Sequence, residues 1–230
     1  PDVLCMQETK LANDKFPTAE IAALGYESAH FGQGQWNGVA IVSKVGLENV
    51  LPNFAPGVEP DTEARIITAT CAGVRISSVY VPNGRELDHD HYRYKLDWMA
   101  RLRTHVAAEN TPDDQVVVMG DFNIAPEDKD VWDPAKYIGA THVSDPERAA
   151  LDSLCWGLPP KRLLVRAPRL PRPGFGVWAF LAPPSSVGAG AGCGLQLPPH
   201  SQRKGPVGEM GFWHGSALLD TTFALHRSSC

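Results

Sequence analysis

The residues with the clearest chemical potential are Asp121 and Asn123, in the segment VVVMGDFNIAP at 116–126. Four apolar residues, 116–119, predict a buried strand that Gly120 ends. A carboxylate and a carboxamide two positions apart on an extended backbone project to the same side. The carboxylate can take a proton or bind a hard cation, and the amide can donate to or accept from water or a phosphate oxygen. The competing interpretation is a strand closed by an Asx-type turn without chemistry.

A second carboxylate, Glu8, follows another predicted strand at residues 3–6, in the run Gln7-Glu8-Thr9-Lys10. Two carboxylates at the ends of two core strands could share one divalent cation. Mg²⁺ takes one or two carboxylates together with water and substrate phosphate oxygens. A solvated surface charge is the alternative for Glu8.

Two further segments offer groups that could bind a substrate. Tyr80 and Asn83 lie where SVYVPNG ends a strand in a turn, and they present a phenol and an amide to an anion. Trp36, just before the strand GVAIVSK, could stack on a base or sugar. A plain hairpin end and a packing aromatic are the alternatives.

The run Asp88-His89-Asp90-His91 resembles a set of metal ligands, but we interpret it as a helix start. It immediately precedes the longest predicted helix, at 91–109, where a capping Asp and acidic first-turn residues are expected. Leu96, Met99, Leu102 and Val106 recur at helical spacing and predict the buried face of that helix.

The other segments indicate an architecture dominated by strands. Strands are predicted at 26–31, 38–44, 47–54, 63–71, 74–81 and 115–119, and short helices at 16–24 and 146–156. The turn Ala72-Gly73 indicates a hairpin between two of these strands. Strands that pair as neighbours, with few helices between them, favour two packed sheets flanked by helices over an alternating βαβ sheet.

Composition limits the class of protein. The chain has 230 residues and a net charge of −5, which does not suit simple phosphate attraction but suits a cation-dependent site. No apolar run is long enough to span a membrane, and no leader is visible. The five cysteines form no C-x-x-C pair, which argues against a disulfide framework and a zinc site, and a reducing cytoplasm fits best.

The last third of the chain has a different composition. Residues 157–230 hold 10 of the 20 prolines and 11 of the 21 glycines, and carry 8 Lys+Arg against 2 Asp+Glu. Residues 1–156 carry 13 Lys+Arg and 24 Asp+Glu. We therefore predict a core at 1–156 and an atypical basic tail at 157–230, which is either disordered or, as we favour, the product of a frame-shifted translation.

Five segments in order, CMQETK, WNGVAIVSK, EARIIT, SVYVPNG and GDFNIAP, resemble the exonuclease III family of AP endonucleases. This is a branch of the endonuclease/exonuclease/phosphatase superfamily, and the resemblance covers about residues 1–156. SVYVPNG, with KLDW at 95–98, favours this branch over sphingomyelinase-like or inositol-phosphatase relatives. The resemblance implies an α+β fold, a DNase I-like four-layer α/β-sandwich of two mostly antiparallel sheets flanked by helices, incomplete at both ends.

The resemblance also implies a role for each matching residue. Glu8 matches the metal-ligand glutamate, and Tyr80 the tyrosine that contacts the scissile phosphate. Asp121 matches the aspartate that activates or orients the attacking water. Asn123 matches the asparagine that positions water and phosphate. Mg²⁺ or Mn²⁺, held by Glu8 with Asp121 and Asn123, is the implied cofactor.

Asn83 matches an asparagine with a supporting role toward the phosphate, and Arg65, in EARIIT, supports the site. The implied substrate is double-stranded DNA, incised at abasic sites and shortened from 3′ ends in base-excision repair. We expect a cytoplasmic monomer that contacts no membrane.

Two departures from the family pattern lead to a further expectation. The W-N-x-N strand that opens the family is not in the sequence, and neither are F-T-W-W, I-D-H-L or the terminal S-D-H. His200, His214 and His226 lack the context of that last histidine. We therefore expect this 230-residue chain to have little or no nuclease activity. A same-fold phosphatase or phospholipase acting on small phosphoesters, and an inactive truncated product, stay open as alternatives.

Overall fold

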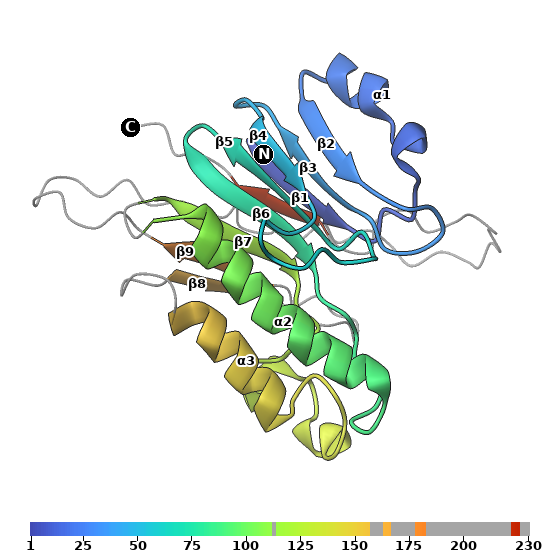
Figure 1. Ribbon diagram of the computed structural model, residues 1–230, viewed down its shortest axis with the longest axis vertical. Helices are drawn as coiled ribbons and strands as arrows, with labels where there is room; N and C mark the ends of the chain where they lie inside the picture. The colour runs from blue at the N-terminus through green and yellow to red at the C-terminus, as the bar shows by residue number, and fades with distance from the viewer. Residues whose placement is uncertain (112–113, 157–162, 167–177, 183–221, 226–230) are drawn as a thin grey trace, which may run out of the picture.

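The computed structural model describes residues 1–111, 114–156, 163–166, 178–182 and 222–225, which form two β-sheets packed face to face (Figure 1). The larger sheet has the order β4 (Glu48–Pro52), β5 (Ile66–Cys71), β6 (Val74–Tyr80), β7 (Val116–Asp121), β9 (Trp178–Ala182), β8 (Leu163–Arg166). The smaller sheet has the order β10 (Thr222–Leu225), β1 (Val3–Gln7), β3 (Val39–Ser43), β2 (Glu27–Phe31). The expected class, two packed and mostly antiparallel sheets with helices, is confirmed.

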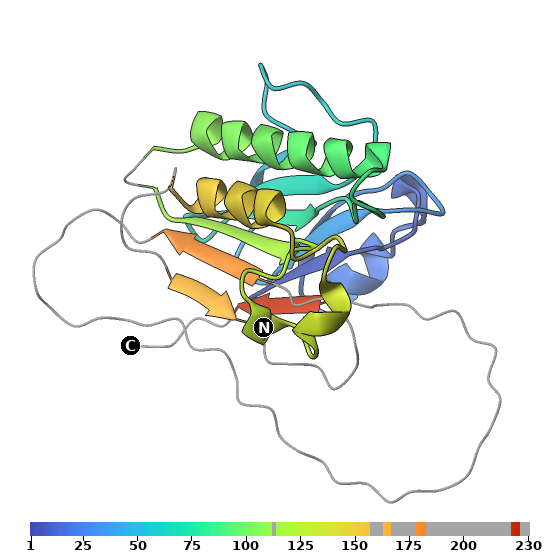
Figure 2. The same cartoon turned by 90° about the horizontal axis from the view of Figure 1, so that it is seen from below.

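Helices flank this pair of sheets. The long helix α2 (Asp90–Glu109) and α3 (Asp145–Trp156) lie side by side over the outer face of the larger sheet (Figures 1 and 2), and α1 (Thr18–Ala23) adjoins β2. Three short 3₁₀ helices complete the described elements: η1 (Asn13–Lys15), η2 (Asp128–Asp130) and η3 (Pro134–Tyr137). The pair β6–β7 is parallel, and α2 is the crossover that a parallel pair requires.

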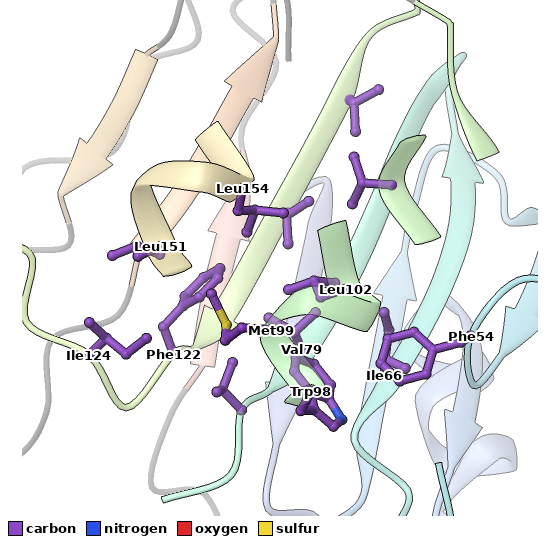
Figure 3. Close-up of a cluster of buried hydrophobic side chains, with 14 residues drawn as sticks. Phe54, Ile66, Val79, Trp98, Met99, Leu102, Phe122, Ile124, Leu151 and Leu154 are labelled. Atoms are coloured by element: carbon purple, nitrogen blue, oxygen red, sulfur yellow. The ribbon is translucent and has the colours of Figure 1, made fainter. Parts of the chain in front are cut away.

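Alternating side chains divide β7 between two apolar layers. Val116 and Val118 face the helices, and Val117 and Met119 face the smaller sheet. The helix-side layer is built around Trp98, with the side chains labelled in Figure 3. Because β7 is buried on both faces, its ends are held rigidly.

The free cysteines among the described residues also lie between the sheets. Cys5 and Cys71 are both buried, and burial raises the pKa of each thiol above its ordinary value. Such thiols stay protonated and unreactive.

Three local predictions need correction. The strand β7 does not end before Gly120 but continues to Asp121, because Gly120 pairs with Val79 of β6. Gly120 has φ +148°, and a Cβ there would lie 1.9 Å from the carbonyl oxygen of Val79, so only glycine allows this close approach. The strand β5 begins at Ile66, which leaves Arg65 just before it rather than within it.

The start of α2 gives the third correction. The N-cap is His89, whose Nδ1 accepts from the amide of His91, rather than an aspartate. The helix begins at Asp90, one residue before the predicted start, and Asp90 is the acidic residue of the first turn. On the buried face, Leu96 is only partly buried, and Tyr92, Lys95 and Trp98 are buried.

Three described strands, β8, β9 and β10, come from residues 157–230 and pair with β9, β7 and β1 respectively. The boundary at 156, and the disorder or aberrant origin of the tail, stay predictions, and most of that region lies outside the described residues. Within the described ranges, no helix is long and apolar enough to cross a membrane.

Candidate active site at the strand ends

Two predicted site residues, Tyr80 and Asp121, are direct neighbours at the ends of adjacent strands. They form the last register pair of the parallel strands β6 and β7. The chain then continues from each strand into a turn, with Asn83 after β6 and Asn123 after β7. Because parallel strands end at the same edge of a sheet, all four residues lie at one edge.

Glu8 reaches this edge from the other sheet. It directly follows β1 in a left-handed backbone conformation, with φ +51°. The sheets are linked here, since Gln7 Nε2 donates to Ser78 Oγ over 2.9 Å. The Glu8 carboxylate lies close enough to the Tyr80 hydroxyl to raise the pKa of the phenol, so a carboxylate of one sheet faces the phenol of the other.

The two asparagines form a linked amide pair. Asn123 has φ +50° and is 2% exposed. Its backbone N–H donates to Asp121 Oδ1 over 2.9 Å, and its Nδ2 donates to the carbonyl of Val81 over 2.9 Å. The Nδ2 of Asn83 lies 3.4 Å from Asn123 Oδ1 and 3.2 Å from His142 Nε2. The Asx-type turn of the competing interpretation is therefore present, and its hydrogen bond orients the Asp121 carboxylate toward the Asn123 backbone.

The surroundings of Asp121 favour its protonated form. Loss of water around the carboxyl and the nearby Glu8 raise its pKa to about 6, although the Asn123 N–H, Lys95 and Arg65 act in the opposite direction. Burial, Glu8 and Asp121 together raise the pKa of the Tyr80 phenol. The phenol therefore stays protonated at neutral pH, while Asp121 is mostly ionised and easily protonated.

Arg65 supports this arrangement from the edge of β5. Its Nη1 donates to the carbonyl of Tyr80 over 3.2 Å, and its guanidinium carbon lies 4.8 Å from the centre of the Tyr80 ring. Its Nε forms a 2.5 Å ion pair with Glu63. These contacts fix Tyr80 and place a positive charge beside the acidic groups.

Trp36 lies in the loop before β3, which contacts the Glu8 loop. The backbone N–H groups of Thr9 and Lys10 donate to the carbonyls of Gly38 and Asn37. Trp36 itself is 70% exposed, so its ring is open to a ligand at this rim.

The residues at this edge suit a hard divalent cation. Glu8 and Asp121 each disfavour ionisation of the Tyr80 phenol, and the Glu8 charge also disfavours ionisation of Asp121. A cation between the two carboxylates would remove the repulsion between their charges. The described residues contain no group of three or more His, Cys, Asp or Glu side chains that could hold a metal. The oxygen donors that this edge offers are the Glu8 and Asp121 carboxylates and the Asn123 amide, a set that differs from a zinc-type cluster.

Comparison with known proteins decides the family. The sequence model of the Endonuclease/Exonuclease/phosphatase family matches residues 1–194 of this chain. This chain belongs to that family. Within the family, its relatives include the exodeoxyribonuclease III of Haemophilus influenzae, 31% identical over 136 residues, which are 57% of this chain and 51% of the relative. The chain thus spans about half the length of that relative.

Solved structures of family members agree. An AP endonuclease from Archaeoglobus fulgidus superposes with a TM-score of 0.70 at 30% identity, covering 79% of this chain and 76% of that one. A 3′-5′ exonuclease from Neisseria meningitidis gives a TM-score of 0.65 at 41% identity, covering 68% and 61%. The resemblance stated from the five segments is therefore confirmed, and with it the DNase I-like fold.

Sequence reasoning missed three buried polar residues of this family member: Lys95, Glu147 and His142. The Lys95 ammonium donates to the carbonyls of Asn123 and Asn83 and pairs with Glu147. A signal was available, because Lys95 falls in the spacing 92, 95, 99, 102, 106 of the buried helix face, where an apolar residue is expected. His142 carries no comparable pattern.

Proposed function

We propose that this site hydrolyses phosphodiester bonds of double-stranded DNA with a divalent cation, in the manner of an exodeoxyribonuclease III. Removal of nucleotides from 3′ ends and incision at abasic sites, as a monomer in DNA repair, are the activities we infer. The observation that carries the proposal is the convergence of Glu8, Tyr80, Asp121 and the two asparagines from two sheets. A structure of a related Neisseria 3′ phosphatase, 40% identical, is bound to a product DNA hairpin, which supports DNA as the ligand.

The acidic residues have complementary tasks in this proposal. Glu8, Asp121 and Asn123 would hold the cation, which supplies charge stabilisation to the phosphate and the leaving oxygen when bound. Asp121 is ionised at neutral pH and is oriented by the Asn123 N–H, so its carboxylate can accept the proton of an attacking water.

The neutral groups hold the phosphate. The Tyr80 phenol, whose pKa is raised, stays protonated and can donate to a phosphate oxygen. Asn123 uses one Nδ2 hydrogen for Val81 and keeps a second for water or phosphate. Asn83 lies beside it, and the exposed Trp36 ring offers a stacking surface at the rim.

The test combines binding and turnover, since each reports a different part of the site. Anisotropy of a fluorescent hairpin duplex, with a recessed 3′ end or an abasic analogue, is measured in Mg²⁺ and in EDTA, and cleavage is followed on gels. We expect tighter binding in Mg²⁺ and loss of any cleavage in Asp121→Asn. Glu48→Gln, a matched change of an exposed carboxylate in β4, is the control and should change neither result.

The outcomes separate the proposal from its alternatives. Binding that is the same in Mg²⁺ and EDTA, or hydrolysis of an inositol phosphate or sphingomyelin in place of DNA, would contradict the proposal. The expectation of little or no turnover also stays a prediction. Cleavage that Asp121→Asn abolishes would overturn that expectation and support the nuclease assignment.

A further inference from the structure

The proposed chemistry does not use a pair of charged side chains that are completely buried in the described part of the chain. Lys95, in α2, and Glu147, in α3, both have fully buried side chains and form a 2.5 Å ion pair. A buried pair often contributes little net stability, because loss of hydration opposes the attraction. An apolar pair of the same size would fill the space between the helices, so the charges call for another explanation.

The contacts of Lys95 supply one. Its Nζ donates to the carbonyl of Asn123 over 2.6 Å and to the carbonyl of Asn83 over 3.2 Å, besides Glu147. An ammonium has three hydrogens, and all three are directed to these acceptors. Two of them therefore hold the backbones of both site asparagines, which belong to turns after different strands.

Glu147 extends the same link to a third loop. One carboxylate oxygen accepts from Lys95 and from the N–H of His142, and the other accepts from the N–H and hydroxyl of Ser144. The Nε2 of His142 faces the Nδ2 of Asn83 at 3.2 Å. Since an amide nitrogen only donates, His142 Nε2 accepts and its proton lies on Nδ1, toward Thr141 Oγ1.

We propose that Lys95 is a positioning residue, which fixes the Asn83 and Asn123 amides at the geometry that a phosphate requires. The inference rests on the proposed function, because the phosphate is the ligand that those amides would bind. Lys95 acts through the two backbone carbonyls and does not itself reach the substrate.

Three variants separate positioning from stability. Lys95→Met removes the ammonium and leaves Glu147 unpaired. Lys95→Met/Glu147→Gln removes both charges, so no charge is left buried and unpaired, but the carbonyls still lack their donor. Glu147→Gln leaves the ammonium on both carbonyls. Arg75→Met is the matched control, because Arg75 pairs with Glu109 at 2.7 Å at the opposite end of β6 from Tyr80.

The readouts are unfolding by urea, DNA affinity in Mg²⁺, and the side-chain amide signals of Asn83 and Asn123 in the ¹⁵N-asparagine-labelled chain. Asn83→Asp and Asn123→Asp assign the two signals. We expect the double variant to unfold cooperatively, at a lower urea midpoint than wild type because the buried Asn123 carbonyl loses its donor. We also expect it to shift both signals and to bind DNA about tenfold or more weakly, because hydrogen bonds from a charged donor are lost. Glu147→Gln and Arg75→Met should keep both signals and bind within about threefold of wild type.

Unchanged Asn83 and Asn123 signals in a folded double variant would overturn the positioning role. If the double variant does not fold, the single variant Glu147→Gln provides the test. Shifted Asn83 and Asn123 amide signals in Glu147→Gln would show that the ion pair is only structural. Retained signals would support the positioning of the two amides by Lys95. Wild type that does not bind DNA would refute the proposed function, while the amide signals still decide the role of Lys95.

Discussion

Replacing Asp121 with asparagine should make the protein more stable at pH 8 and remove any turnover that the wild type has. The folded-state pKa of Asp121 is about 6, and its ordinary value is 3.8. The folded chain therefore binds this proton more tightly than the unfolded chain does, so folding stability falls as the pH rises from about 4 to 6. At about 1.4 kcal/mol for each pKa unit, the ionised carboxyl costs about 1–3 kcal/mol at pH 8. Asparagine, which stays neutral, avoids that cost.

Urea unfolding in EDTA, at pH 4 and at pH 8, measures the difference. The free energy of unfolding of Asp121→Asn should exceed that of wild type at pH 8, and the two should approach each other at pH 4. Mg²⁺ should then stabilise wild type and reduce the difference, because a cation that binds only the folded carboxylates adds to stability.

Asp114→Asn is the control with the opposite sign. Hydrogen bonds from Thr111 lower the pKa of the exposed Asp114 carboxyl, so its contribution is present above the ordinary pKa and is lost as the pH falls. That variant should be the less stable one at pH 8. Equal stability of Asp121→Asn and wild type at pH 8, or a gain that persists unchanged at pH 4, would refute the electrostatic reasoning.

Three other perturbations have expected outcomes. Trp98→Ala should lower the free energy of unfolding by about 3–5 kcal/mol in urea titrations, because the buried ring leaves a cavity, whereas the 63% exposed Trp132→Ala should change it by about 0.5 kcal/mol or less. Gly120→Ala should lose more stability than Gly139→Ala, whose φ is also positive but whose added Cβ meets open space, as paired thermal melts would show. Trp36→Ala should weaken DNA binding by about 1–3 kcal/mol in anisotropy titrations and leave the melting temperature unchanged.

Strand ends were the part of the site that sequence could predict. An apolar run followed by polar residues marks where a strand leaves the core, and Glu8, Tyr80 and Asp121 all follow such runs. Their convergence on one edge came from the family resemblance, because no local pattern states that β6 and β7 are parallel. The position of Arg65 beside Tyr80 depends on the same sheet order.

Other features depend on tertiary contacts that short patterns do not encode. The end of β7 was misplaced because glycine usually breaks a strand, whereas Gly120 stays in register with its carbonyl neighbour in β6. Lys95 was not assigned a role, because a lysine in a helix is usually solvated, and its partner Glu147 is 52 residues away. The helix cap was assigned to an aspartate, although the His89 imidazole offers the same acceptor.

The division of the acidic groups between two sheets has a consequence for the whole sandwich. Glu8 directly follows β1 of the smaller sheet, and Asp121 ends β7 of the larger sheet. A cation that binds both would therefore cross-link two layers that otherwise meet mainly through apolar contacts. Loading the protein with Mg²⁺ should therefore slow amide hydrogen exchange in β1 and β7 together, far along both strands from the ion itself. In this architecture the bound cation would stabilise the packing of the two sheets as well as take part in the reaction.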